Sequence, residues 1–359
     1  MRKMLAGLLG IVLLFFTQFS AWAQEPGVPT VGEERQEEKR KAAMATRVAE
    51  VERGGALLPA GRLVIEPSFE YDHISGTNVA ISGFTIFEAI LIGQVSVQRL
   101  RRDIFIPALT IRAGLKHAEL YLRIPWLFRS DSLVYPVSGG AASNITQRNF
   151  GDNGLGDITS YLYYHLITEG KWRSWVPDTV IRLGLNFPSG KDPYSVKRRL
   201  VPSLGSIIPV EFPTGTGHWG LAVGSTFVKT VDPAVVFLNL GYYINFGRHV
   251  GTAGDPPQNF GYIKLGNTFE YSVGVILALQ EKLSLNFAFQ QRVSGATYQN
   301  GRFLPDTQIN AISFNIGATY VIPPRMAVDF VVGIGLSKDA PDVTVLIRTP
   351  IMFEFGRKR

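Results

Sequence analysis

An alternation of apolar and polar residues over Asn267 to Val293 constrains this fold more than any other feature. Its second half alternates Leu283, Leu285, Phe287 and Phe289 with Ser284, Asn286, Ala288 and Gln290, and its first half behaves alike. Successive side chains of a β-strand point to opposite faces, so each half predicts a strand with one apolar and one polar face. Residues 280–283 form a polar turn between them. Each strand, at roughly ten residues, is long enough to cross a bilayer when tilted, although a soluble β-sandwich also alternates.

The same two-residue period recurs along the chain from residue 61 to residue 355. Alternating segments occupy residues 63–71, 105–112, 119–126, 181–186, 219–227, 238–245, 312–320, 326–336 and 343–355. Charged residues are only 18% of the chain, and no run after the first 20 residues is apolar enough for a membrane helix. Because backbone amides in lipid need partners, a membrane protein without such helices must be a closed barrel. The repeat therefore predicts an all-β, transmembrane antiparallel barrel.

The lengths of the connections between these segments also alternate. Short ones cover 115–117, 168–173, 230–233, 280–282 and 322–325, and long ones cover 129–154, 188–217, 247–266 and 294–306. Outer-membrane barrels have short periplasmic turns and long external loops. Counting back from a periplasmic C-terminus gives 12 strands, the first over residues 85–99 and the second over 103–115. Residues 61–73 then lie outside the wall, unless 78–100 form two strands and the total is 14; we favour 12.

The N-terminus reads as an export signal. Residues 1–23 combine a basic start, an apolar stretch and a small-x-small site, which predicts a signal peptide cleaved between Ala23 and Gln24. The chain has no cysteine, which excludes disulfides and a thiolate metal site. Within the segment 24–60, residues 33–53 are rich in Glu, Arg, Lys and Ala, and we expect the segment to be a short periplasmic helix, either a linker or a plug. Residues 61–355 are the expected barrel, and residues 356–359 are a basic tail.

The search for catalytic, cofactor or metal chemistry gives no candidate. The stretch from Gly215 to Gly220 matches a dinucleotide fingerprint literally, but a strand follows it instead of a helix, so we interpret it as a loop rim. The five histidines show no metal-ligand spacing, and no Gly-x-Ser-x-Gly occurs. We therefore predict no catalytic residue, no cofactor and no enzymatic activity. The net charge of +7 is scattered, which argues against a nucleic-acid partner.

The polar faces of the predicted strands carry charge. By alternation, the lumen-lining candidates are Arg112, Glu119, Arg123, Arg182, Glu270, Asp329, Arg348 and Glu354. They either fill a closed barrel or border a water-filled passage, and we favour a passage because about 12 strands enclose more room than side chains fill. Trp126, Phe128, Trp172, Trp175 and Trp219 sit near strand ends, as in interfacial girdles. Arg99, Arg101 and Arg102 form a basic turn that is either solvated or binds lipopolysaccharide phosphates.

Several short motifs together resemble known outer-membrane families. Residues 54–59, 66–68 and 83–86 (GGALLP, EPS and GFTI) resemble the start of the barrel in Fap-type functional-amyloid secretion channels. Residues 154–158, 187–190 and 212–217 (GLGDI, FPSG and FPTGTG) resemble the Gly-x-Gly-Asp and Pro-Thr-Gly stretches of the transporter-like family "MetA-pathway of phenol degradation". The resemblance implies a 12-stranded barrel and, for the Fap-type branch, export of amyloid subunits with periplasmic trimerisation and a plugging helix.

These observations predict an outer-membrane channel of a Gram-negative bacterium that passes small organic solutes or a secreted polypeptide. The alternative is a structural or adhesive barrel with a blocked lumen, and an outer-membrane hydrolase is the third hypothesis. The expected partners are outer-membrane lipid and lipopolysaccharide, the barrel assembly machinery, and the transported solute or amyloid-like polypeptide. Assembly into a homo-oligomer is a further hypothesis.

Overall fold

The computed structural model describes residues 57–81, 95–136, 145–171, 173–201, 206–209, 211–232, 234–255, 257–280, 282–305, 307–323 and 325–354. The chain divides into two units, Met1–Met44 and Ala45–Arg359, and every described residue belongs to the second. The predicted signal peptide, nearly all of the predicted segment 24–60 and the basic tail lie outside the described residues.

The described strands close into an antiparallel barrel. Its wall consists of β1 (Arg62–Ile81), β2 (Val95–Gly114), β3 (Ala118–Pro136), β5 (Ile158–Ile167), β6 (Asp178–Phe187), β9 (Gly220–Val231), β10 (Ala234–Asn245), β13 (Thr268–Gln280), β14 (Leu283–Ser294), β17 (Ile309–Ile322), β18 (Met326–Gly335), β19 (Val343–Arg348) and β20 (Ile351–Glu354). Strands β19 and β20 occupy one place in the wall, since both pair with β1. The described wall therefore has twelve strand positions, closed where β1 meets β19 and β20.

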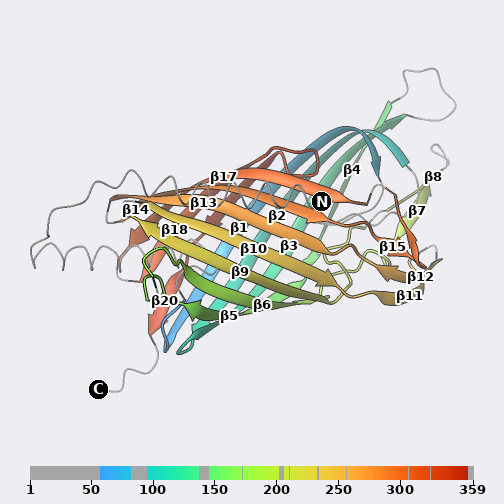
Figure 1. The fold of residues 1–359 in the computed structure, drawn as a ribbon. Coiled ribbons are helices and arrows are strands. Elements are labelled where there is room, and N and C mark those ends of the chain that lie inside the picture. Colours follow the sequence, from blue (N-terminus) through green and yellow to red (C-terminus); the bar gives the residue numbers. More distant parts are fainter. Residues whose placement is uncertain are drawn as a thin grey trace, which may run out of the picture. The chain divides into compact units, whose positions relative to one another are not determined.

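The remaining described strands gather beyond one end of the barrel (Figure 1). Strand β4 (Ile145–Leu155) pairs with the second half of β3, while β5 pairs with its first half. The hairpin β7 (Arg198–Val201) and β8 (Ser206–Pro209) is separate, and β11 (Arg248–Ala253), β12 (Gln258–Lys264), β15 (Tyr298–Gln299) and β16 (Arg302–Phe303) form a small sheet. We call this end the long-loop end and the opposite end the short-turn end.

The predicted number of 12 wall strands is confirmed, but the prediction of which residues form the first of them is wrong. Residues 62–81 lie in the wall as β1, in register with β2 from Leu63 to Ile81. Residues 95–99 are the beginning of β2, a single strand of 20 residues, so no separate strand spans 85–99 and the alternative of 14 strands is also wrong. The proposed basic turn is a strand too, because Arg99 pairs with Thr77 on one side and with Val134 on the other.

The hairpin predicted from the alternation is present as β13 and β14. Their register runs from Thr268↔Ser294 to Ala278↔Ser284 and shifts by one residue just before the turn. Strand β10 continues the sheet beside β13, and β17 continues it beside β14. Because both edges of the hairpin are paired, it is part of the barrel wall and has no free edge.

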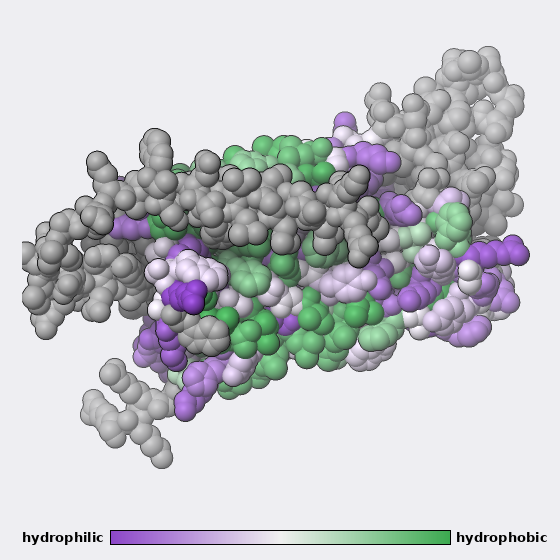
Figure 2. Space-filling model, viewed as in Figure 1, coloured by the Kyte–Doolittle hydropathy of each residue, from purple (hydrophilic) through white to green (hydrophobic). Residues whose placement is uncertain are grey.

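The outer face of the barrel is an apolar belt. Large apolar side chains are exposed there on many strands, among them Phe69, Phe105, Leu120, Leu162, Leu183, Val223, Tyr242, Phe269, Tyr320, Phe330 and Ile347. Figure 2 shows this belt between hydrophilic ends. An exposed patch of this extent on a closed barrel is a lipid-facing surface, so the barrel spans a membrane. Among the described residues, no helix is long and apolar enough to cross a membrane.

Candidate functional site

The inner wall of the barrel is polar and charged. Alternate residues of each strand face inward, and on β1, β2 and β3 these include the buried Glu66, Arg112, Glu119, Arg129 and Asp131. The inward charges form ion pairs. Five of them join different strands, namely Arg112–Glu119 at 2.6 Å, Arg123–Glu70 at 3.0 Å, Arg102–Asp131 at 3.0 Å, Arg292–Glu270 at 2.7 Å and Arg348–Asp329 at 3.7 Å, and one, Arg129–Asp131 at 2.6 Å, lies within β3. Paired charges of this kind can be buried because each guanidinium supplies a counter-charge to a carboxylate.

The eight lumen candidates occupy these inward positions at different depths. Arg112, Glu119, Asp329 and Arg348 are buried, and they form two of the ion pairs. Arg123, Arg182 and Glu270 are half-buried. Glu354 is exposed and pairs with Arg62 at 3.3 Å. That these residues border a passage stays a prediction.

Sequence reasoning missed several members of these pairs. Arg102 was assigned to a turn, and Arg129 and Asp131 to a long loop, whereas all three are inward residues of β2 and β3. The usable signal was the alternation itself. It extends past the end of the predicted strand through Phe128 and Arg129, whereas Ser130 and Asp131 are both polar and give no such signal.

Several inward glycines leave room for large side chains of neighbouring strands to lie against the inner wall. A Cβ atom added at Gly184 would lie 2.3 Å from the ring of Tyr161, and one at Gly317 would lie 2.5 Å from the amide of Asn286. At Gly241 it would lie 2.6 Å from a nitrogen of Arg182. A side chain therefore occupies the volume that the missing Cβ leaves open.

Asp157 organises the long-loop end. It stands between β4 and β5, and its carboxylate accepts hydrogen bonds from two segments of the connection between β6 and β9, one before and one after the β7–β8 hairpin. Oδ1 accepts from the backbone N–H of Gly190 at 3.1 Å. Oδ2 accepts from the backbone N–H of Thr216 at 2.7 Å and from its hydroxyl at 2.6 Å. The residues of the three glycine-rich motifs thus converge on one carboxylate.

The glycines of these motifs permit this close contact. A Cβ atom at Gly215 would lie 2.2 Å from Oδ1 of Asp157 and 2.8 Å from Cα of Gly190, so only glycine fits. The Ser189 hydroxyl donates to the carbonyl of Gly156 at 2.8 Å and accepts from the N–H of Ile158 at 2.9 Å. We call this arrangement of residues 154–158, 188–190 and 213–217 the Asp157 cluster.

The loop held by the Asp157 cluster lies against the inner wall. Phe212 is buried, and the guanidinium of Arg129 stacks 4.3 Å above its ring. Lys191 Nζ donates to Asp152 at 2.8 Å. Because Arg129 is an inward residue, part of the connection between β6 and β9 is folded inside the barrel at the long-loop end. The interpretation of residues 215–220 as a loop rim agrees with this placement, and β9 begins at Gly220.

A buried histidine fastens the same connection to its neighbours. His218 Nδ1 lies 2.9 Å from the carbonyl of Phe246, and Nε2 lies 2.6 Å from the hydroxyl of Tyr194. A carbonyl can only accept, so we assign the proton to Nδ1, and Nε2 then accepts from Tyr194. Burial lowers the pKa of His218, with the nearby Arg248 adding to the effect, so its neutral form is favoured.

Tyr194 anchors a small apolar core under this histidine. It packs with Phe260, Ile263 and Leu265, and its ring centroid lies 5.3 Å from that of Phe260. Asp192 pairs with Arg248 at 2.9 Å. Burial acts to raise the pKa of Asp192, but the hydrogen bonds from Arg248 and Ser195 outweigh it and hold the pKa below its usual range.

Residues just before β1 contact the inner wall at the short-turn end. The backbone N–H of Leu58 donates to Glu119 Oε2 at 2.8 Å, and the Leu58 side chain is buried. Leu57 packs on Tyr121, Tyr163 and Val180. Tyr121 and Tyr163 are inward residues of the wall, so the chain enters the barrel interior before it turns into β1.

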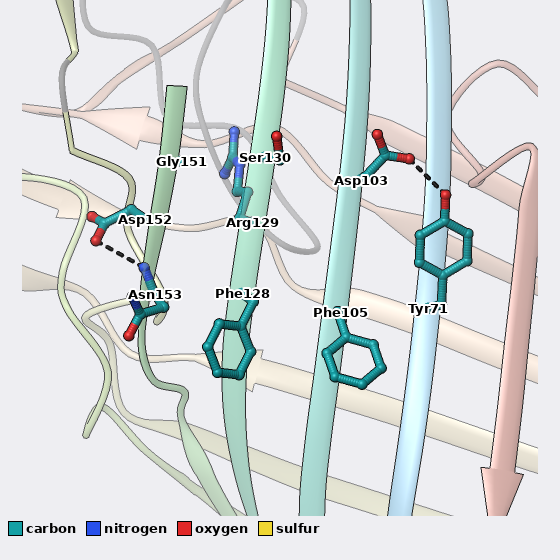
Figure 3. A pocket seen from close by; sticks show the side chains of 9 residues that line it. All are labelled: Tyr71, Asp103, Phe105, Phe128, Arg129, Ser130, Gly151, Asp152 and Asn153. Atoms are coloured by element: carbon teal, nitrogen blue, oxygen red, sulfur yellow. Dashed lines mark hydrogen bonds between the residues drawn. The ribbon is translucent and has the colours of Figure 1, made fainter. Parts of the chain in front are cut away.

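The outer face carries a hollow of about 450 Å³ between β1 and β4. Figure 3 shows Phe105 and Phe128 along it, with Tyr71 donating to Asp103 at 2.6 Å. His73 contacts the same carboxylate at 2.7 Å. Arg101 is exposed on β2 nearby, whereas Arg102 points inward and is buried. The lining also includes Arg129 and Asp152, which contact the inward-folded loop, so the hollow reaches the same part of the wall. Among the described residues, no group of three or more His, Cys, Asp or Glu could hold a metal ion.

Solved structures share the barrel fold. An outer-membrane channel from Pseudomonas putida F1 superimposes with a TM-score of 0.55 at 15% identity, covering 82% of this chain and 97% of that one. The translocator domain of the autotransporter NalP from Neisseria meningitidis gives 0.45 at 11% identity, covering 89% and 98%. The P. putida toluene transporter TodX gives 0.40 at 9% identity, covering 84% and 91%. The last two are too distant to support an argument, and the first supports the fold alone.

A family model covers most of the barrel. The family described as putative MetA-pathway of phenol degradation matches residues 118–349, which include β3 to β19 and the whole Asp157 cluster. The resemblance to Fap-type channels stays a prediction. The chain belongs to the putative MetA-pathway of phenol degradation family, as the resemblance of its glycine-rich motifs to those of that family had predicted.

Proposed function

We propose that this protein is an outer-membrane channel for small organic solutes. The observation that carries the proposal is an inward-folded loop, held by the Asp157 cluster, inside a barrel whose inner wall is polar. A polar interior supports passage of solutes, and a loop folded into a barrel narrows that passage to small molecules. Membership of a family described by phenol degradation supports organic solutes as the cargo class.

The chain also occupies part of the barrel interior at the short-turn end, which supports the same proposal. Leu57 and Leu58 lie against inward residues at the short-turn end. They end the segment 24–60 that the sequence predicts to be a linker or a plug, and residues 24–56 of that segment lie outside the described residues. Export of a polypeptide, which the Fap-type resemblance implies, needs a wider path than small solutes do, and no observation on the described residues favours it.

Conductance across planar lipid bilayers tests the channel directly. The purified wild-type protein is expected to show discrete openings. Asp157→Ala removes the shared acceptor of Gly190 and Thr216, and each buried donor left unpaired costs roughly 1–3 kcal/mol. The loop is then expected to leave the inner wall and the mean conductance to rise.

The matched control is Asp255→Asn, which removes a carboxylate at the same end of the molecule. Asp255 is exposed, so the conductance of the Asp255→Asn protein is expected to equal that of the wild type. Removal of residues 24–53 tests the predicted plug in the same assay and is expected to increase open time. If the wild type, Asp157→Ala and the protein lacking residues 24–53 all fail to conduct, the channel proposal is wrong, and the structural barrel with a blocked lumen replaces it.

A further inference from the structure

One arginine of the inner wall differs from the others. Arg62, Arg102, Arg112, Arg123, Arg129, Arg292 and Arg348 each form an ion pair with a carboxylate. Among the described inward arginines, Arg182 of β6 has neither an ion pair nor a hydrogen bond, and its buried Nη2 is without a partner. Arg123 also has a buried nitrogen without a hydrogen bond, its Nε, but its Nη2 pairs with Glu70. A buried guanidinium without any counter-charge is costly, so the lack of an ion pair is what distinguishes Arg182.

The wall is shaped to hold this guanidinium. Arg182 is the cross-strand neighbour of Gly224 on β9, which is in turn opposite Gly241 on β10. A Cβ atom at Gly224 would lie 2.5 Å from Nε of Arg182, and one at Gly241 would lie 2.6 Å from its Nη2. The arginine therefore lies flat across two strands, in a groove that two glycines leave open.

The nearest carboxylate along this row of cross-strand neighbours already forms an ion pair with another arginine. Glu270 on β13 is opposite Gly241, but it accepts from Nε of Arg292 at 3.1 Å and from Nη2 of Arg292 at 2.7 Å. The row thus contains two arginines and one carboxylate, and the positive charge of Arg182 is in excess. The half-buried side chain keeps part of its surface open to the barrel interior.

Tyrosine rings border the same groove. Tyr163 is the cross-strand neighbour of Arg182 on β5, and its ring centroid lies 5.9 Å from that of Tyr161. Tyr243 lies on the other side, with its ring edge 3.4 Å from the Cβ position of Gly241. Tyr161 and Tyr243 are half-buried and offer ring surface to the interior. Together these groups pair a cationic donor with aromatic faces.

We propose that Arg182, Tyr161 and Tyr243 form a binding site on the inner wall for a small aromatic carboxylate. The planar fork of a guanidinium matches a carboxylate, and tyrosine rings attract another ring. Binding of such an anion supplies the partner that Arg182 lacks. The site deepens the proposed function, on which it rests for its role in transport, because it selects anionic aromatic molecules among the organic solutes.

Calorimetric titration of the detergent-solubilised protein with benzoate tests the site without any need for conductance. Benzoate is expected to bind the wild type more tightly than acetate, which lacks the ring, and than phenol, which is neutral at pH 7. Arg182→Gln removes the guanidinium without taking an ion-pair partner from any carboxylate. It is expected to weaken benzoate binding by roughly 10-fold. Arg62→Gln removes an inward arginine elsewhere and is expected to bind benzoate as the wild type does.

Gly241→Ala is the second variant, since it keeps the charge and displaces the guanidinium by the 2.6 Å clash. It is also expected to weaken benzoate binding, with the heat-modified electrophoretic shift of the folded barrel unchanged. The site is overturned if Arg182→Gln binds benzoate as tightly as the wild type, or if phenol or acetate binds equally well. If the protein conducts but does not bind benzoate, the binding site is wrong and the channel proposal stands. If it binds benzoate but does not conduct, the binding site stands and the channel proposal is wrong.

Discussion

At the scale of single residues, His218 joins the inward-folded loop to its surroundings, and burial favours its neutral form. Its Nε2 accepts from Tyr194 and its Nδ1 donates to the carbonyl of Phe246. Protonation turns Nε2 into a donor, so the Tyr194 bond must reverse, and it places a positive charge in a buried site near Arg248. Since burial lowers the pKa of His218 below the ordinary value of about 6.5, the seated loop binds the proton less well than the released loop does.

The sign of the pH dependence follows from this difference. Above pH of about 6.5 both states are neutral and the loop stays seated, and as the pH falls below that value the released state gains protons and is favoured. We therefore expect conductance in planar bilayers to rise on acidification. His218→Gln is expected to remove this response, and His249→Gln, at an exposed histidine of the same end, to retain it. An identical pH response in His218→Gln would contradict the assignment.

At the scale of elements, the strand pair β13 and β14 divides its side chains between lipid and interior. Phe289 on β14 faces outward, where its ring centroid lies 6.1 Å from that of Tyr271. The next residue, Gln290, faces inward opposite Ser272 and Ser313. Adjacent positions of one strand thus meet opposite environments, which makes them a matched pair for a test.

The test introduces the same residue at both positions. Phe289→Glu places a carboxylate against hydrocarbon and is expected to destabilise the barrel by about 2 kcal/mol. Gln290→Glu places it on the polar wall and is expected to change stability by less than about 1 kcal/mol. Urea titration of the barrel folded into lipid vesicles measures both. Equal destabilisation of the two variants would show that the faces are assigned wrongly.

At the scale of the whole molecule, closure depends on the interrupted last strand. Pro350 cannot donate to the ladder, and the strand divides into β19 and β20 there. The interruption is tolerated because Thr349 N–H donates to the carbonyl of Pro67 at 3.0 Å, which carries the pairing with β1 past the break. Strand β20 then pairs Ile351 with Ile65 and Glu354 with Arg62.

Removal of residues 351–359 should therefore open the seam. The edges of β1 and β18 then present unpaired amides to lipid, and each such group costs several kcal/mol. We expect the truncated protein to lose the heat-modified electrophoretic shift of a folded barrel. Removal of residues 356–359 alone leaves β20 intact and is expected to preserve that shift. A folded barrel after the longer truncation would mean that β20 is dispensable for closure.

Sequence by itself determined the class of the fold, the number of wall strands and the two faces of most of them. The physical reason is that alternation is local: Phe289 and Gln290 differ in environment because neighbours on a strand point in opposite directions. The family motifs at Gly154, Pro188 and Pro213 were equally readable, because glycine and proline are needed for backbone geometry that few other residues adopt.

Only the tertiary structure decided what depends on pairing between distant strands. Alternation cannot tell that β1 enters the wall, because a strand is part of the wall only through its partners β2 and β19. Nor can it tell Arg182, which lacks a partner, from Arg348, which has Asp329. The role of Asp157 was hidden for the same reason: its partners Gly190 and Thr216 come 33 and 59 residues later in the chain. Partnership is set by strand register and loop path, and neither is encoded in a residue's own sequence neighbourhood.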